Sequence, residues 1–213
     1  MQLKALLFDL DGTLADTLPL CIQSYQHAFA GLFGRPFSEE EITAHFGLTE
    51  TGIFQRIAPD QWEQGLQDYF RYYEEHHIEC REPFPGITAV LDFLTAHGVS
   101  LAVVTGKGAY SANYSLNYLG LSHYFTLVSA GSEDAIIKSQ SIRDILTTWQ
   151  IDPRDAAYIG DADTDIREAE LAGVLPLGAQ WSSNSTIHRL AKTPELTFAS
   201  IPDFLHWLHT NLP

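Results

Sequence analysis

The sequence predicts an α/β protein whose core is a doubly wound parallel sheet, interrupted after its first strand by an all-helical insert. Three observations support this class. Short apolar runs alternate with helical patterns through most of the chain, as buried parallel strands and their crossover helices do. Residues 17–83 break this alternation with helical patterns and no convincing strand. The length of 213 residues is enough for one core and a small second unit.

Continuous apolar runs that end at small or polar residues predict the strands. The predicted strands cover residues 3–8, 100–105, 125–129, 156–159, 174–177 and 196–199, the last two being the weaker patterns. Ligands of a doubly wound sheet bind outside the carboxyl ends of its strands. Asp9, Asp11, Thr105 and Asp161 all fall at such ends. We therefore expect these four residues to share one crevice.

Apolar residues at helical spacing predict three helices between the later strands. These helices cover residues 87–97, 138–150 and 164–172. Gly98 and Gly173 follow the first and the third as typical helix ends, and Asp163 is the expected cap of the third. Strands that alternate with helices in this way favour parallel pairing.

The insert is predicted to be a helical cap joined to the core by two hinges. Its helical patterns cover residues 20–29, 38–45 and 61–77. Ser38 and Glu41 have the spacing of a capping box at the start of the second helix. With hinges at Thr17 and near Pro83, the chain divides in two. The predicted domains are a core of residues 1–16 and 84–213 and a cap of residues 17–83.

Charge and composition exclude several classes of partner. Lys and Arg number 12 against 27 for Asp and Glu, which gives a formal net charge of −15. Such a chain repels nucleic acid and anionic membranes at long range, so we expect neither as a partner. No apolar run approaches the ~18 residues of a membrane span, and the run at residues 5–8 is too short for a signal peptide. We therefore expect a cytoplasmic protein.

Four other residues that could suggest special chemistry are given plainer interpretations. Cys21 and Cys80 have no metal-ligand spacing and are too few for a disulfide scaffold, so free thiols are expected. His76 and His77 could suggest a metal site, but adjacent residues on a helix point apart. We interpret this pair as a solvated helix end.

Asp9 and Asp11 are the strongest candidates for chemistry. Two carboxylates just past a buried strand can both point into one crevice, where one attacks as a nucleophile and the other gives and takes protons. Like charges this close are tolerated when a divalent cation shares them, and oxygen-only ligands suit magnesium. Gly12 allows a close backbone turn, and the Thr13 hydroxyl can fix the loop.

The segment Asp9-Leu10-Asp11-Gly12-Thr13-Leu14 resembles the DxDGTL signature of the haloacid dehalogenase-like hydrolase superfamily. Three later segments resemble the other motifs of that superfamily in the expected order. They are Val104-Thr105-Gly106, Lys138 at a helix start, and Gly160-Asp161-Ala162-Asp163-Thr164-Asp165. The resemblance runs from about residue 3 to residue 207 and is greatest to the phosphoglycolate phosphatase-like branch. It implies a Rossmann-like core with an inserted helical cap.

The resemblance also implies magnesium-dependent hydrolysis of a small phosphomonoester. Asp9 would attack phosphorus to form an aspartyl-phosphate, Asp11 would act as acid and then base, and Lys138 would neutralise charge. The implied ligands of Mg²⁺ are Asp9, the Asp11 backbone carbonyl, Asp161 and Asp165. The implied phosphate contacts come from Asp11, Gly12, Thr105, Gly106, Lys107 and Lys138. These roles suit phosphoryl transfer, which depends mainly on positioning and charge stabilisation.

Two residues depart from the pattern of many relatives. Lys138 is followed by Ser139-Gln140-Ser141 where those relatives have Pro-x-Pro. Lys107 is the other lysine close to a motif and is the alternative to Lys138. Gly106 stands where many relatives have Asn, a change that keeps the backbone amide.

The loop His45-Phe46-Gly47-Leu48-Thr49-Glu50 lies where relatives with this cap contact the leaving group. It offers an imidazole, a hydroxyl and a carboxylate but no Arg or Lys. A second anionic group on the substrate would find little complement in this loop. The loop therefore disfavours sugar bisphosphates and phosphoglycolate as substrates.

Two alternatives to a phosphatase remain, and three others are disfavoured. A phosphomutase of the β-phosphoglucomutase kind uses the same motifs, and the relatives that this chain resembles include inorganic pyrophosphatases. Dehalogenation is disfavoured by an acidic residue at Asp11. Phosphonoacetaldehyde hydrolysis is excluded because no lysine lies between Lys4 and Lys107 to form a Schiff base. A non-catalytic binding protein would be expected to lack one of the motif aspartates. The expected partner is a small phosphorylated metabolite, bound by a monomer or weak homodimer.

Overall fold

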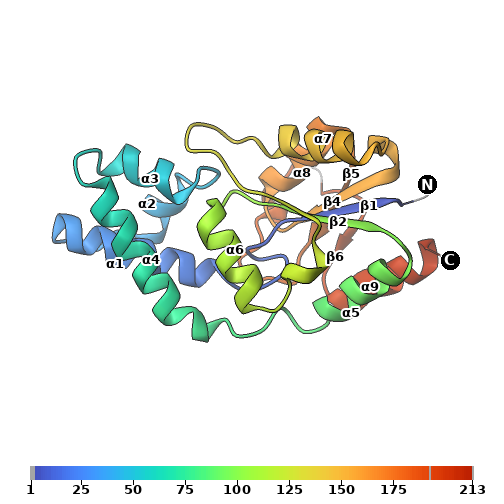
Figure 1. The fold of residues 1–213 in the computed structure, drawn as a ribbon, viewed down its shortest axis with the longest axis horizontal. Helices are drawn as coiled ribbons and strands as arrows, with labels where there is room; N and C mark the ends of the chain where they lie inside the picture. Colours follow the sequence, from blue (N-terminus) through green and yellow to red (C-terminus); the bar gives the residue numbers. More distant parts are fainter. Residues whose placement is uncertain (1–2, 192, 213) are drawn as a thin grey trace.

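A six-stranded parallel sheet forms the centre of one half of the molecule (Figure 1). The computed structural model describes residues 3–191 and 193–212. The strands lie in the order β3-β2-β1-β4-β5-β6, and every neighbouring pair is parallel. Their bounds are β1 Ala5–Phe8, β2 Ser100–Val104, β3 Leu127–Ser129, β4 Ala156–Gly160, β5 Leu175–Ala179 and β6 Thr197–Phe198. The predicted fold class and all six predicted strands are confirmed.

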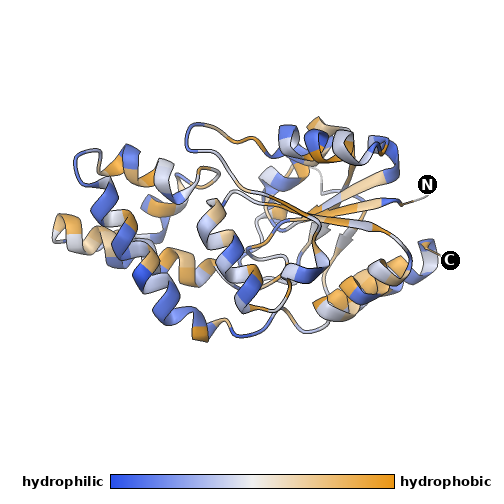
Figure 2. Cartoon of the chain, in the orientation of Figure 1, coloured by the Kyte–Doolittle hydropathy of each residue, from blue (hydrophilic) through white to orange (hydrophobic). Residues whose placement is uncertain are grey.

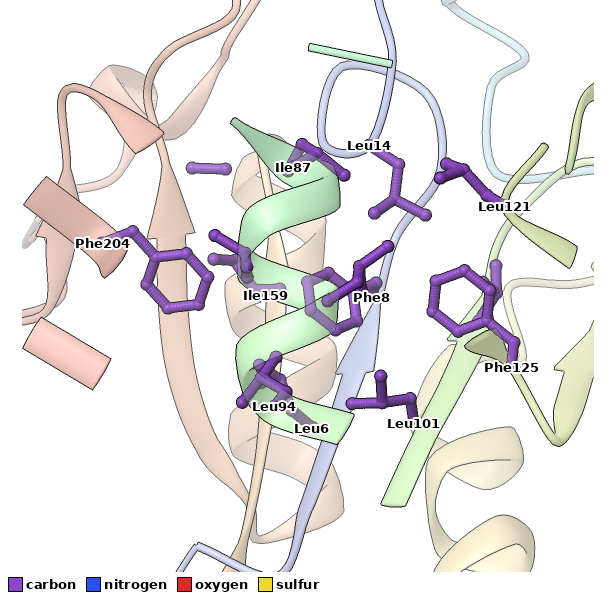
Figure 3. Close-up of a cluster of buried hydrophobic side chains, with 14 of the residues drawn as sticks. Leu6, Phe8, Leu14, Ile87, Leu94, Leu101, Leu121, Phe125, Ile159 and Phe204 are labelled. Carbon is purple, nitrogen blue, oxygen red and sulfur yellow. The ribbon is translucent and has the colours of Figure 1, made fainter. Parts of the chain in front are cut away.

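Helices cover both faces of the sheet (Figure 1). The helices α5 Ile87–Ala96 and α9 Ile201–Asn211 lie on one face, and α7 Lys138–Trp149 and α8 Asp163–Ala172 lie on the other. Side chains of β1 alternate between the two layers, with Leu6 and Phe8 facing α5 and α9. Figure 3 shows Phe8 among Ile87, Leu94 and Phe204. Because β1 is buried on both sides, it can be continuously apolar up to Asp9.

The segment between β1 and α5 contains helices only. They are α1 Leu18–Phe33, α2 Glu39–Thr43, α3 Glu50–Ile57 and α4 Trp62–His76, followed by the 3₁₀ turn η1 His77–Glu79. An aromatic core joins them, with Tyr25, Phe29, Phe54, Tyr69 and Tyr73 buried together. These helices lie beside the carboxyl ends of the strands (Figure 1). The exact domain limits at residues 16/17 and 83/84 stay a prediction.

One helix links this segment to the sheet. Helix α6 Ala109–Tyr118 follows β2 and packs against α4. The Tyr73 hydroxyl lies 2.7 Å from the Ser115 hydroxyl, and His77 Nε2 lies 3.1 Å from the same oxygen. The interpretation of His77 as a solvated residue was therefore wrong, because it is fully buried between Tyr73 and the α6 residues Ser115 and Tyr118. Its neighbour His76 turns back to the Tyr72 carbonyl.

Of two predicted helix caps, one is confirmed and one is wrong. At α2 the capping box is present, since the Glu41 amide donates to the Ser38 hydroxyl and the Ser38 amide donates to the Glu41 carboxylate. At α8 the predicted Asp163 cap was wrong, because Ala162 occupies the cap position. The Asp165 carboxylate accepts from the Ala162 amide there.

The remaining short elements are 3₁₀ turns. They are η2 Ser122–Tyr124, η3 Pro153–Asp155 and η4 Ile187–Arg189. The strands are mostly hydrophobic along their length, while the surface helices carry polar residues on their outer sides (Figure 2). No helix among the described residues is both long and apolar enough to cross a membrane.

Candidate active site

A cavity of about 690 Å³ opens where the carboxyl ends of β1, β2 and β4 meet the helical segment. All the predicted site residues line it except Gly12. These are Asp9, Asp11, Thr105, Gly106, Lys107, Lys138, Asp161 and Asp165. Parallel strands bring their carboxyl ends to one edge of the sheet, so residues far apart in the sequence converge there.

Asp9, Asp161 and Asp165 form an acidic cluster at the floor of the cavity. Asp9 follows β1, Asp161 follows β4 and Asp165 lies in the first turn of α8. One carboxylate oxygen from each lies within 4.8 Å of the others, and all three residues are buried. Oxygen donors at this spacing could hold one divalent cation. No other cluster of this kind occurs within residues 3–191 and 193–212.

Lys138 neutralises part of this cluster. Its ammonium lies 2.9 Å from Asp9 Oδ1 and 2.6 Å from Asp165 Oδ1. Burial alone would lower the pKa of Lys138, but the Asp165 and Asp9 carboxylates raise that pKa well above its usual value. The lysine therefore stays charged beside Asp9. The first turn of α7 is fixed because the Ser139 amide donates to Glu168.

Burial and like charge act on the carboxylates. Burial, together with the nearby Asp165 and Asp11, raises the pKa of Asp9 to about 7 despite the opposing effect of Lys138. Burial and the carboxylates of Asp165 and Asp9 also raise the pKa of Asp161 well above its usual value. Both pKa shifts arise first from burial, and the neighbouring carboxylates add to them.

Asp165 is fixed by more hydrogen bonds than the other two acids. Besides Lys138, its Oδ1 accepts from the Tyr158 hydroxyl at 3.2 Å, and its Oδ2 accepts from the Ala162 amide at 3.0 Å. Tyr158 is itself fixed by a bond to the Val104 carbonyl. Asp165 is thus a rigid carboxylate with little freedom to reorient.

Asp11 points toward the helical segment. Its Oδ1 accepts from the Thr17 hydroxyl at 2.5 Å and lies 3.6 Å from Cys21 Sγ. The Lys107 ammonium lies 3.4 Å from the same oxygen and 2.9 Å from Cys21 Sγ. Lys107 is buried, with its ammonium also over the Tyr73 ring. The structure thus places Lys107 beside Asp11 and Lys138 beside Asp9.

Two glycines allow the loops of the site to approach closely. Gly12 has φ +75°, and a Cβ there would lie 2.3 Å from an Asp161 carboxylate oxygen. Gly131 has no such φ, but a Cβ there would lie 2.2 Å from the Gly106 carbonyl oxygen. The Thr105 hydroxyl accepts from the Lys107 amide at 3.2 Å, which shapes the turn after β2. Side chains at either glycine would displace these turns.

The loop at residues 45–50 borders the cavity, and two of its polar side chains bond within the protein. Phe46, Gly47 and Leu48 line the cavity with apolar or backbone surface. The Thr49 hydroxyl caps α3 by accepting from the Gly52 amide. Glu50 is buried and accepts from the Gly108 amide at 2.7 Å and from the Ser111 hydroxyl. Its carboxylate therefore holds the start of α6 to α3.

Sequence reasoning missed one wall of the cavity. The loop after β5 contributes Ser183, Asn184, Ser185, Thr186, His188 and Arg189 to the lining. Its signal was a run of polar residues directly after an apolar strand. Because the carboxyl end of β5 lies at the same edge as the other strand ends, the strand-end rule could have found it.

A family model of haloacid dehalogenase-like hydrolases matches residues 6–179. The chain belongs to this family. Pyrophosphatase PpaX of Halalkalibacterium halodurans is 26% identical to it over 207 residues, 96% of each chain. Phosphoglycolate phosphatase of Neisseria meningitidis is 29% identical over 188 residues, 83% of this chain and 80% of the relative. A solved haloacid dehalogenase-like hydrolase from Streptococcus pneumoniae is 26% identical with a TM-score of 0.78, covering 97% of this chain and 98% of its own.

Proposed function

We propose that this protein is a magnesium-dependent phosphatase that hydrolyses a small phosphomonoester through an aspartyl-phosphate on Asp9. The observation that carries the proposal is the buried group of Asp9, Asp161 and Asp165 with Lys138 between two of them. Membership of the haloacid dehalogenase-like hydrolase family and the phosphoglycolate phosphatase relative support the same reaction class.

The residues present fit a magnesium ion. Three carboxylates and one ammonium leave the cluster with a formal charge of −2. Burial, together with neighbouring carboxylates, raises the pKa of Asp9 and of Asp161, and a divalent cation would balance the charge of their ionised forms. The donors are all oxygens, the ligand type that Mg²⁺ prefers. When bound, the ion would neutralise charge on the phosphoryl oxygens.

The chain's own residues divide the reaction between them. A carboxylate oxygen of Asp9 attacks phosphorus, and Lys138 offsets the negative charge that both groups bring together. Asp11 gives a proton to the leaving oxygen and later takes one from the water that attacks the aspartyl-phosphate. The Thr105 hydroxyl and the Gly106 amide hold the phosphoryl oxygens in place.

Pyrophosphate hydrolysis is the second candidate, because relatives along most of the chain carry the pyrophosphatase PpaX name. Pyrophosphate offers the same reacting group, with phosphate as the leaving group in place of an alcohol. The site chemistry at Asp9 is common to both substrates. A direct comparison of pyrophosphate with phosphomonoesters decides between them.

The test is a screen of phosphorylated metabolites, p-nitrophenyl phosphate and pyrophosphate, with Mg²⁺ or with a chelator. We expect hydrolysis that needs Mg²⁺ and that falls by roughly 10⁴-fold in Asp9→Asn, because the variant lacks the nucleophile. Asp60→Asn, an exposed site outside the cavity, is the control and should keep the wild-type rate. An Asp9→Asn variant that hydrolyses near the wild-type rate would refute the assignment.

Two lysine variants extend the screen. Lys138→Ala should lower kcat for every substrate, because its ammonium contacts Asp9. If Lys138→Ala leaves the rate unchanged and Lys107→Ala abolishes it, Lys107 and not Lys138 is the lysine that neutralises charge in the reaction.

A further inference from the structure

The loop after β5 forms a polar part of the cavity lining, which we call the polar wall. Its contribution consists of hydroxyl, amide, imidazole and guanidinium groups, from Ser183, Asn184, Ser185, Thr186, His188 and Arg189. Glu39 and Glu40 from the first turn of α2 also line the cavity. The wall extends the cavity beyond the acidic cluster and offers a place for the non-reacting part of a substrate.

This wall is built onto the acidic cluster itself. The Ser185 hydroxyl and the Thr186 amide both donate to the Asp161 carbonyl, at 2.7 and 3.0 Å. The Thr186 hydroxyl also accepts from the Asp163 amide at 3.1 Å. Ile187 is fully buried against Gly178 of the sheet, which fixes the turn η4. His188 and Arg189 are therefore presented from a fixed base beside Asp161.

Arg189 is the one lysine or arginine lining the cavity that forms no ion pair with any residue the structure describes. Lys107 is paired with Asp11, and Lys138 with Asp9 and Asp165. Asp163, the acid that the loop itself contacts, is paired with Arg167 at 3.0 Å. The guanidinium of Arg189 is exposed and has its donors available.

We propose that Arg189 is a specificity residue that binds a second anionic group, a carboxylate or a phosphate, on the non-reacting part of the substrate. The inference rests on the proposed phosphatase function. A guanidinium matches the planar carboxylate or a phosphate with two parallel hydrogen bonds. Glu39 and Glu40 add negative charge to the cavity lining from α2, and backbone hydrogen bonding together with the Ser38 hydroxyl lowers the pKa of Glu40. The distal anion is therefore directed to the Arg189 side of the cavity.

The test compares ligands that differ only in the distal group. The 3-phosphoglycerate and glycerol 3-phosphate pair differs by a carboxylate, and the fructose 1,6-bisphosphate and fructose 6-phosphate pair differs by a phosphate. Each is measured as an inhibitor of p-nitrophenyl phosphate hydrolysis in the presence of Mg²⁺. We expect the wild type to bind the anionic member of at least one pair about fivefold more tightly. The ratio of the two inhibition constants within that pair should fall to about one in Arg189→Gln and be partly restored in Arg189→Lys.

Arg71→Gln is the matched control, since Arg71 is an exposed arginine outside the cavity, and its ratio should equal that of the wild type. An unchanged ratio in Arg189→Gln would overturn the proposal, as would a wild type that does not favour the anionic member of either pair. If Arg189 instead only offsets the charge of Glu39 and Glu40 in the cavity, its loss would weaken the binding of both members of a pair alike, and the unchanged ratio would overturn the proposal. A wild type that hydrolyses no phosphate ester would instead refute the proposed phosphatase function.

Discussion

At the scale of single residues, charge balance governs the site. Asp9 is surrounded by Asp11, Asp161 and Asp165, and a single ammonium at Lys138 contacts it. Burial and the neighbouring carboxylates of Asp165 and Asp11 raise the pKa of the proposed nucleophile in the metal-free protein. A nucleophilic carboxylate must be ionised. A bound cation would favour the ionised form of Asp9, so we expect the activity to depend on that cation.

The raised pKa of Asp9 predicts a specific dependence of stability on pH. An ordinary aspartate titrates near pH 4 in the unfolded chain, while Asp9 titrates at about 7 in the folded protein. Between these pH values the folded state binds more protons than the unfolded state. The free energy of unfolding therefore decreases as pH rises from about 4 to about 7. Asp9→Asn removes this loss. We expect the variant to gain on the order of 2 kcal/mol relative to wild type between pH 5 and pH 8.

Urea denaturation without divalent cations at the two pH values checks this prediction. Asp60→Asn alters an exposed aspartate and should show no such gain. A constant difference between Asp9→Asn and wild type across the range would show that burial does not raise the pKa of Asp9.

At the scale of elements, helix α3 joins the helical segment to the sheet half. The Thr49 amide donates to the Ser132 carbonyl, and the Arg56 guanidinium donates to the Asp134 carbonyl. Gly52 lies so close to this loop that a Cβ would be 2.2 Å from the Glu133 carbonyl oxygen. Glu50 completes the junction through its bonds to α6. These contacts fix how the helical segment sits over the cavity.

Removal of the Glu50 carboxylate should destabilise the protein. In Glu50→Ala the Gly108 amide loses its acceptor, and the Ser111 hydroxyl keeps only a weaker bond to the Gly108 carbonyl. We expect the free energy of unfolding to fall by about 1–3 kcal/mol. The control Glu63→Ala, on the exposed side of α4, should change it by less than about 0.5 kcal/mol. Equal effects of the two variants in urea denaturation would show that Glu50 does not stabilise this junction.

The strands and several helices could be predicted because their residues repeat a simple pattern. The helix α6 could not, since its buried positions include Ser111, Ala112 and Ser115 in place of large apolar residues. The Ser115 hydroxyl contacts Tyr73 and the Ser111 hydroxyl donates to Glu50, and such tertiary contacts give no periodic signal in the sequence. By contrast, Ile201, Phe204 and Leu208 of α9 have helical spacing. That helix was not predicted, although this spacing would have allowed it.

At the scale of the whole molecule, the site is assembled from segments that are distant in the sequence. The positions of Asp9, Thr105 and Asp161 could be predicted from the sequence because each ends a strand of one parallel sheet. The pairing of Lys107 with Asp11 could not, because it depends on how α1 and α4 cover the turn after β2. The wall that carries Arg189 likewise depends on how the loop after β5 folds back on Asp161.

The central claim is that Asp9 carries the phosphoryl group during turnover. Protein mixed with p-nitrophenyl phosphate and Mg²⁺ is quenched in acid at short times, digested, and analysed by mass spectrometry of the peptide that contains Asp9. We predict one added phosphoryl group on a fraction of this peptide in wild type. The modified fraction should be larger in Asp11→Asn, which lacks the base that activates water, and zero in Asp9→Asn. Release of phosphate with the phosphoryl group on a different residue, or on none at any time, would contradict the account.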